Sequence, residues 1–220
     1  MEPSNRPALT REAIVTAAIG LADEGGLEAV TMRGVGQRLG ASGMALYRHV
    51  ANRDDLVALM VDRVAGQFAY PEPRPADWRE GLAEVARQDW RSFFAHPWML
   101  PATATARPAL GPHLLANMEW SLACLDDFDL PAHERLYLLG TVTGYAQGLA
   151  LVWLSSNTPE TRRGTSDWWR EEVAKAGDYP RLSALVHELS PEVAVEEEFE
   201  FGLTRILDGV AAHLSTRARP

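Results

Sequence analysis

Hydrophobic residues recur every three or four positions along most of the chain, which is the period of an α-helix packed on a core. The first helix is expected to begin after Thr10, a residue type that caps helix N-termini, and to end at the pair Gly25-Gly26. Its apolar positions are 13, 14, 17, 18 and 21. No stretch alternates between apolar and polar residues as a half-buried strand does. The pattern therefore predicts an all-α protein.

Three short helices are expected next, over about 31–40, 43–50 and 52–69, with Thr31, Ser42 and either Asn52 or Asp54 at their N-termini. Three prolines within residues 71–75 then interrupt the helical pattern. Beyond them we expect helices at about 77–95, 97–106, 111–127, 131–155, 179–189 and 193–215, and one short helix near Trp168 within 156–178. We assign residues 1–53 to an N-terminal three-helix domain and residues 54–220 to a larger helical domain, which begins with a connecting helix at about 54–69.

Residues 31–53 have the pattern of a helix-turn-helix. Gly40 stands in the tight turn, where the chain needs a left-handed residue after a helix end. Apolar positions 35, 39, 46 and 50 supply a small core. The helix after this turn, at about 43–50, presents mostly small or hydrogen-bonding side chains, as a helix entering a DNA major groove about 12 Å wide requires. These residues are Gly43, Met44, Ala45, Tyr47, Arg48 and His49. The alternative is an ordinary helical corner with a solvated arginine face.

The net charge of −9 is distributed unevenly. Residues 31–53 hold four arginines and no acidic residue, whereas residues 54–220 hold 15 basic and 25 acidic residues. A small basic face on an acidic body still binds phosphates, because salt confines the interaction to about 10 Å. Arg33 is expected to reach a base edge or a phosphate, and Arg48 and Arg53 lie near the phosphate track. Thr31 and Ser42 place backbone N–H groups at helix N-termini, which suits phosphate.

The sequence lacks the motifs of several other kinds of site, namely disulfides, nucleotide-binding loops and metal sites. The single cysteine, Cys124, excludes an internal disulfide. The single lysine, Lys175, follows Ala174 and not a glycine, which excludes a phosphate-binding P-loop. Residues 34–40 miss the dinucleotide-binding pattern, because the third glycine comes one residue late and no strand precedes it. The six histidines form no HxxxH or HExxH pair, so we expect neither a metal nor a cofactor.

Residues 136–154 form an uncharged run of 19 residues, with Gly140, Gly144 and Gly148 at a spacing that suits packed membrane helices. A membrane span and a buried core helix are the two alternatives. Polar residues at 141, 143, 145 and 147, and the lack of an adjoining basic cluster, favour the core helix. Residues 1–7 are polar and no apolar segment follows, so we expect no signal peptide and a cytoplasmic protein.

Five short motifs within residues 10–56 carry a family resemblance. They are Gly25-Gly26-Leu27-Glu28, Thr31-Met32-Arg33, Leu39-Gly40-Ala41-Ser42, Ala45-Leu46-Tyr47-Arg48-His49-Val50 and Asn52-Arg53-Asp54-Asp55-Leu56. Together they resemble the N-terminal DNA-binding domain of tetracycline-repressor (TetR) type regulators. Residues 199–209 resemble the last helix of the tetracycline-repressor subfamily. The resemblance implies an all-helical homodimer that represses a promoter by binding double-stranded operator DNA, here expected to be palindromic, and releases it when a small molecule binds.

The resemblance also implies roles for individual residues. Arg33 would contact a base, and the residues facing base edges would be Gly43, Met44 and Ala45. Phosphates would be contacted by Thr31, Tyr47, His49 and Arg53. Gly34 and Gly36 stand where the family usually has bulkier helix formers, and each costs about 1 kcal/mol in a helix interior. We therefore expect the helix at about 31–40 to be only marginally stable until DNA binding orders it.

Two apolar stripes are candidates for a dimer interface. Both recur at alternating steps of four and three, as helices in a four-helix packing do. The first stripe is Leu138, Val142, Tyr145, Leu149 and Val152, and the second is Phe199, Leu203, Ile206 and Val210. From periodicity alone, both stripes would face the core of their own chain. The resemblance implies the other alternative, because that family dimerises through these two helices.

The larger domain is rich in aromatic residues, which with a few polar groups suit a cavity for a small, largely apolar effector. The alternative is that these aromatic residues only fill the core. The candidate ligand-binding residues are Val85, Asp89, Phe93, Thr103, Asn117, Ser121, Tyr145 and Gln147. By resemblance, Thr103 replaces the metal-binding histidine of the tetracycline repressor, and Val85 and Asp89 replace two drug contacts. We therefore expect neither tetracycline nor magnesium as the effector.

Two other functions stay open at this point. The first is a helical enzyme acting on a small molecule, although no nucleophile motif, paired-carboxylate motif or metal cluster supports it. Asp126, Asp127 and Asp129 have the pattern of a solvated helix end. The second is a DNA-binding activator without an effector, which a core without a cavity would favour.

Overall fold

The computed structural model describes residues 9–104, 110–155, 159–188 and 195–217. These residues contain no β-strand, so the predicted all-α class is confirmed. The helices are α1 (Arg11–Gly25), the 3-10 helix η1 (Leu27–Ala29), α2 (Met32–Arg38), α3 (Gly43–Leu46), α4 (Arg53–Gln67), α5 (Trp78–Ala95), α6 (Met99–Thr103), α7 (Pro112–Ala123), α8 (Ala132–Ser155), α9 (Pro159–Ala176), α10 (Pro180–Glu188) and α11 (Val195–Leu214).

Side-chain caps fix the starts of three N-terminal helices. The Thr10 hydroxyl accepts a hydrogen bond from the Ala13 amide at the start of α1, 3.1 Å away. Thr31 caps α2 in the same way, and the side chain of Asn52 caps α4. These caps confirm Thr10, Thr31 and Asn52 as N-terminal residues, because each satisfies a backbone N–H group that has no partner inside its helix.

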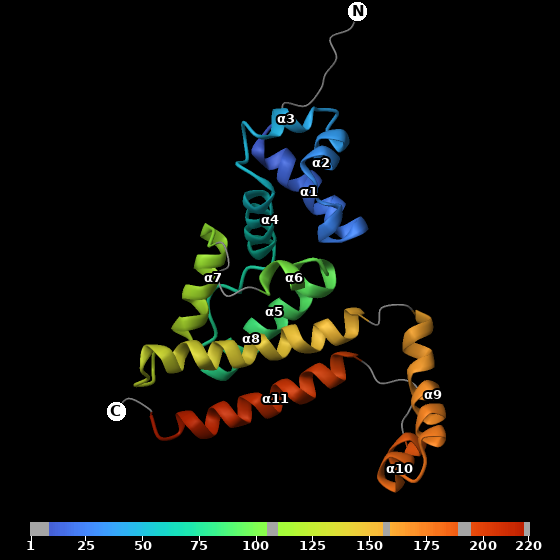
Figure 1. Cartoon of the computed structure of the whole chain (residues 1–220). Helices are drawn as coiled ribbons and strands as arrows, with labels where there is room; N and C mark the ends of the chain where they lie inside the picture. Colours follow the sequence, from blue (N-terminus) through green and yellow to red (C-terminus); the bar gives the residue numbers. More distant parts are fainter. Residues whose placement is uncertain (1–8, 105–109, 156–158, 189–194, 218–220) are drawn as a thin grey trace, which may run out of the picture.

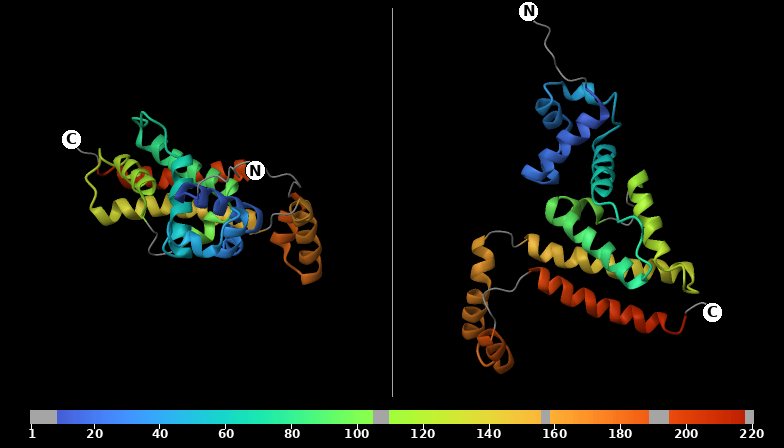
Figure 2. Two further views of the ribbon diagram at one scale, coloured as in Figure 1. Left: turned by 90° about the horizontal axis from the view of Figure 1, so that it is seen from above. Right: turned by 180° about the vertical axis from the view of Figure 1, so that it is seen from behind.

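The helices form a small head and a larger body (Figure 1). In the head, α1, α2 and α3 enclose a core that includes Ile14, Val35 and Leu46. Helix α4 leaves the head and runs into the body, where it contacts α6 and α7 (Figure 1). In the body, α5 packs on α8, and α8 and α11 lie side by side in both figures (Figure 2).

Helix α9 is longer than the short helix expected near Trp168, since it spans 18 residues. It packs against α10, and the pair stands to one side of the body (Figure 1). Trp168 and Trp169 on α9 are about half exposed, at 55% and 44%. The sequence analysis therefore underestimated the length of this helix.

Candidate nucleic-acid interface and ligand cavity

The turn between α2 and α3 depends on two glycines. Gly40 has a φ angle of 65°, the left-handed conformation that the sequence predicted for it. A Cβ atom on Gly36 would lie 2.9 Å from the Ala41 carbonyl oxygen and 3.0 Å from the Gly43 amide. Gly36 therefore lets the turn pack directly on α2. This close packing argues against the expected softness of α2 at that position.

The predicted DNA-contacting side chains lie mainly on the exposed side of the head. Met44 is 78% exposed and Tyr47 is 48% exposed, which is unusual for such large side chains. Arg33 stands next to the start of α3, since a Cβ atom on Gly43 would lie 3.5 Å from the Arg33 Cα atom. Exposed positions are Thr31, Arg33, Ser42, Met44, Tyr47 and Arg48, while Gly43, Ala45 and His49 are half-buried.

The arginines of the head divide into two groups. Among the described residues, Arg33 and Arg48 have no hydrogen-bond or ion-pair partner. Arg38 makes two hydrogen bonds to Glu24, at 2.7 and 2.6 Å. Arg53 was predicted to contact a phosphate, but in the structure its guanidinium group bonds to the protein backbone. Its Nε and one Nη donate to the carbonyl oxygens of residues 30 and 27, both at 2.8 Å. Arg53 thus joins α4 to the segment before α2.

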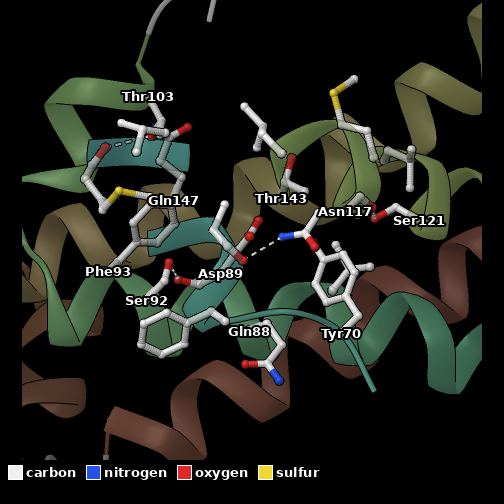
Figure 3. Close-up of a pocket in the computed structure, with 18 of the residues that line it drawn as sticks. Tyr70, Gln88, Asp89, Ser92, Phe93, Thr103, Asn117, Ser121, Thr143 and Gln147 are labelled. Carbon is white, nitrogen blue, oxygen red and sulfur yellow. Dashed lines mark hydrogen bonds between the residues drawn. The ribbon is translucent and has the colours of Figure 1, made fainter. Parts of the chain in front are cut away.

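A cavity of about 320 Å³ lies within the body, bordered by α4, α5, α6, α7 and α8 (Figure 3). Seven predicted ligand-binding residues line it: Val85, Asp89, Phe93, Thr103, Asn117, Ser121 and Gln147. Its volume lies at the lower end of the range for small-molecule sites, about 300–1,000 Å³. A cavity of this kind disfavours the alternative of a DNA-binding protein without an effector.

Tyr145 is the eighth predicted ligand-binding residue, and the structure corrects that prediction. Its hydroxyl donates to the backbone carbonyls of Glu198 and Phe199, at 3.1 and 3.0 Å, and its ring stacks on Phe199. A Cβ atom on Gly202 would overlap the Tyr145 hydroxyl. Tyr145 therefore packs α8 on α11 and does not line the cavity.

Several lining residues were missed by the sequence analysis. The polar ones are Tyr70, Gln88, Ser92 and Thr143. Gln88 and Ser92 were detectable, because positions 85, 88, 89 and 92 share one face of a helix. Tyr70 was not detectable in this way, because it precedes the proline-rich connection between α4 and α5 and only the tertiary fold brings it to the cavity.

Most polar groups in the cavity wall bond to the protein itself. Asn117 Nδ2 donates to the Ala65 carbonyl oxygen at 3.1 Å, and Ser121 Oγ donates to the Asn117 carbonyl oxygen at 2.8 Å. Gln147 Nε2 donates to Thr103 Oγ1 at 3.4 Å, and Thr103 Oγ1 donates to the Met99 carbonyl oxygen. The Asn117 bond matters beyond the cavity, because it joins α7 to α4.

The carboxylate of Asp89 differs from these groups. It has no hydrogen-bond or ion-pair partner among the described residues, and Figure 3 shows Asp89 near the centre of the lining side chains. Burial alone raises its pKa to about 7, because the low-dielectric surroundings disfavour the charged form. Asp89 is half-buried overall and is one of the residues that line the cavity. Burial, followed by the negative charge of Asp89, also raises the pKa of the Tyr70 phenol.

Besides the Asn117 bond, polar contacts of Asp62 and Asp23 connect α4 and the head to the body. Asp62 of α4 is buried, and its Oδ1 accepts hydrogen bonds from the backbone amides of His113 and Leu114 at the start of α7. Asp23 of α1 is bonded by His96 Nδ1 and accepts from Trp98 Nε1, both at 2.7 Å. A shift of the cavity wall therefore has direct routes to the head.

The structure also corrects the predicted dimer surface. Four of its residues, Val142, Phe199, Leu203 and Val210, are at most 4% exposed in the core of their own chain. Leu138, Leu149 and Ile206 are half-buried, and Val152 is 63% exposed. Tertiary packing therefore places four residues of the two stripes in the chain's own core, which is the alternative that periodicity alone favoured, while Val152 stays exposed.

A different stripe of α8 is exposed. It contains Gly140, Gly144, Gly148, Leu151 and Val152, and a Cβ atom on each of these glycines would meet no other atom within 4 Å. Phe201 lies exposed on the neighbouring α11, at 66%. By length and composition α8 is also apolar enough to cross a membrane, and 17% of its most apolar window is buried. The described residues include no cluster of three or more metal-ligating side chains.

Comparison with known protein families decides what kind of protein has this architecture. Residues 14–60 match the family model described as "Bacterial regulatory proteins, tetR family". Residues 70–214 match the model "Tetracyclin repressor-like, C-terminal domain". The chain belongs to the TetR family. The two matches cover most of the head, the first half of α4 and almost the whole body.

Curated relatives of this TetR-family protein are named as transcriptional regulators. It is 34% identical to the HTH-type transcriptional repressor DrrR1 of Streptomyces coeruleorubidus, over 96% of this chain and 81% of the relative. It is 27% identical to the tetracycline repressor protein class C of Escherichia coli, over 92% of this chain and 90% of that protein. The protein is therefore a DNA-binding regulator of transcription and not an enzyme.

Solved TetR-family structures share its fold. The Streptomyces coelicolor TetR family protein ActR in complex with actinorhodin has a TM-score of 0.79 and 31% identity, over 94% of this chain and 99% of that chain. ActR in complex with (S)-DNPA has a TM-score of 0.75 and 29% identity, over the same shares of the two chains. ActR is thus a relative whose complexes with small molecules are known.

Proposed function

We propose that this TetR-family protein represses a promoter in the cytoplasm as a homodimer on a palindromic operator, and leaves it when a small, largely apolar effector fills the cavity. The single observation that carries this proposal is the cavity of about 320 Å³ beside α4, the helix that leads to the head. The complexes of its relative ActR with small molecules support the same function.

The mechanism is a population shift between two arrangements of the head and body. An effector that binds one arrangement more tightly moves the equilibrium toward it. Asn117 links the cavity wall to α4, and Asp62 holds the start of α7. A shift of α7 therefore moves α4 and with it the recognition helix. A tenfold loss of operator affinity requires about 1.4 kcal/mol of coupling.

On the operator, α3 enters the major groove with Gly43, Met44 and Ala45 toward base edges. Arg33 contacts a base, and Arg48 contacts the phosphate backbone, because both guanidinium groups are exposed and lack intramolecular partners among the described residues. Thr31, Ser42, Tyr47 and His49 add phosphate contacts. Arg53 contributes indirectly, since its hydrogen bonds hold α4 against the segment before α2.

The Arg33→Ala variant tests this interface. Losing a side chain that contacts a base is expected to cost about 1–3 kcal/mol of specific binding. The measurement is a fluorescence-anisotropy titration with the DNA upstream of the coding region, alongside a scrambled duplex of the same length. A matched control is Arg63→Ala, which removes an exposed arginine that pairs with Glu12 on α1. Unchanged operator affinity in Arg33→Ala would remove this residue from the interface.

The exposed stripe on α8 supports dimerisation. Its glycines leave open space above the backbone, which allows a helix of a second copy to approach closely. Leu151, Val152 and the neighbouring Phe201 supply exposed apolar surface that a second copy would cover. A two-fold pair also places two recognition helices about 34–36 Å apart, one turn of DNA.

The Gly144→Leu variant tests the dimer. A leucine at this open position would hold the two α8 helices apart, so we expect a monomer in light scattering and a weak operator complex. Glu119→Leu is the control, because it adds the same side chain to an exposed position on α7. A Gly144→Leu dimer as stable as the wild-type dimer would show that the interface lies elsewhere.

A further inference from the structure

Asp89 is the group that can give the cavity a negative charge. Among the described residues that line it, Asp89 carries the only carboxylate and Tyr70 the only other ionisable group, and the rest are apolar, hydroxyl or amide side chains. Its carboxylate has no partner in the described protein and faces the cavity. Other polar groups of the wall already bond to the protein, as Asn117 and Thr103 do. The Asp89 carboxylate is therefore a charged group that a bound molecule can pair with.

The surroundings of Asp89 favour a positively charged partner. An ionised carboxylate in an apolar site is costly unless it is paired and hydrogen-bonded. Tyr70, from the connection before α5, is the titratable neighbour across the cavity, and α6, α7 and α8 contribute only neutral lining residues. Glu84, one turn earlier on α5, is hydrogen-bonded to Gln88 and paired with Arg91. No described cation of the protein neutralises the Asp89 carboxylate.

We propose that the effector is an aromatic molecule that carries an aliphatic amine. The protonated amine pairs with the Asp89 carboxylate inside the cavity. This inference rests on the proposed function, because it names the chemical class of the effector. The apolar walls, which include Phe68 and Phe93, cover the rings of the ligand, and the ammonium group forms a charge-assisted hydrogen bond to Asp89. A neutral ligand leaves the carboxylate unpaired, and an anionic ligand is repelled.

A matched pair of probes tests the charge preference directly. The first is an anthracene that carries a methylaminomethyl group, which is protonated near neutral pH. The second is the anthracene with a methoxymethyl group, which has almost the same shape and no charge. Their dissociation constants for the full chain are measured by calorimetry and by quenching of tryptophan fluorescence. At about pH 8 we expect the amine to bind roughly tenfold more tightly than the ether.

The pH dependence gives a second readout that needs no variant. Pairing with the ammonium group favours the ionised carboxylate, so amine binding at about pH 6 releases a proton from Asp89. The affinity for the amine is therefore expected to rise from about pH 6 to pH 8, through the pKa of Asp89, while the affinity for the ether does not rise. Calorimetry in two buffers of different ionisation enthalpy measures the released proton.

The Asp89→Asn variant removes the charge and keeps the size of the side chain. We expect it to bind the two probes within about threefold of each other, since the pairing is gone. Retained binding of the ether shows that the cavity has folded. Glu80→Gln is the matched control, because it removes an exposed carboxylate from the same helix and Glu80 does not line the cavity, so this variant should keep the amine preference.

Three outcomes would overturn the proposal: equal binding of both probes to the wild-type protein, an amine preference that survives in Asp89→Asn, or no amine binding up to about millimolar concentration. None of them bears on operator binding by the empty protein. If the operator titration fails while the amine preference holds, the proposed function is wrong and the cation site stands. If the operator binds while the preference is absent, only the cation site is wrong.

Discussion

Asp62 is the side chain through which α4 holds the start of α7, and replacing it with alanine is the sharpest test of that junction. Its Oδ1 accepts hydrogen bonds from the His113 amide at 2.9 Å and the Leu114 amide at 3.0 Å. The fit is close, because a Cβ atom on Gly111 would overlap the Asp62 carboxylate. The N-cap residue of α7 is Gly111, which has no side chain to cap the helix, and Asp62 of α4 supplies the cap instead.

The expected loss can be built from these contacts. Removing an N-cap costs about 1 kcal/mol, and leaving buried N–H groups without an acceptor adds about 1–3 kcal/mol. The negative charge at the helix N-terminus contributes about 0.3–1 kcal/mol more. Water entering the vacated space offsets part of the sum. We expect Asp62→Ala to lower the free energy of unfolding by about 2–3 kcal/mol, and Asp62→Asn, which keeps an acceptor, by about 1 kcal/mol or less.

The assay is urea unfolding of the full chain at one fixed protein concentration, because the proposed dimer would make stability depend on concentration. Amide hydrogen exchange over α7 adds a local readout, since its first turn should open more easily in Asp62→Ala. If Asp62→Ala were as stable as Asp62→Asn, the two backbone hydrogen bonds would contribute nothing, and the assignment of Asp62 as the cap of α7 would be refuted.

Two further predictions concern Arg53 and Asp89. Arg53→Ala loses the bonds to residues 30 and 27 and should lower the free energy of unfolding by about 1–3 kcal/mol, whereas exposed Arg48→Ala should change it by less than about 0.5 kcal/mol in the same urea titration. Asp89 binds its proton more tightly when folded than when unfolded, so its ionisation destabilises the wild type as pH rises from about 4 to 7. Asp89→Asn should therefore be more stable than wild type at about pH 8 and similar at about pH 4; equal stability at both would refute this.

Local geometry was predicted better in the head than in the body. In the head, spacing and residue type identified the turn at Gly40 and the exposed face of α3, because a helix-turn-helix is built from local contacts. Arg53 was assigned to phosphate because it is basic and close to the motif. Its actual partners are carbonyl oxygens more than 20 residues away along the chain, which no local pattern reveals.

The body shows where periodicity stops being informative. Residues of α8 are apolar or small on more than one face, so the step of three and four residues fits several stripes. Packing on α5 and α11 buried the stripe that contains Val142 and left the stripe with Gly140, Gly144 and Gly148 exposed. The same limit explains why Tyr145 was wrongly predicted to line the cavity. Its hydroxyl group bonds to backbone carbonyls of α11 instead.

The sequence by itself determined the helical class, the capped starts of α1, α2 and α4, the turn at Gly40 and the family, because all of these depend on residues close together in the chain. Only the tertiary structure decided which face of each long helix is buried, that Asp62 caps α7, and that the Asp89 carboxylate faces a cavity with no partner among the described residues. The physical reason is that a helix fixes the relative directions of its own side chains, whereas the neighbours they meet depend on how the helices pack against one another.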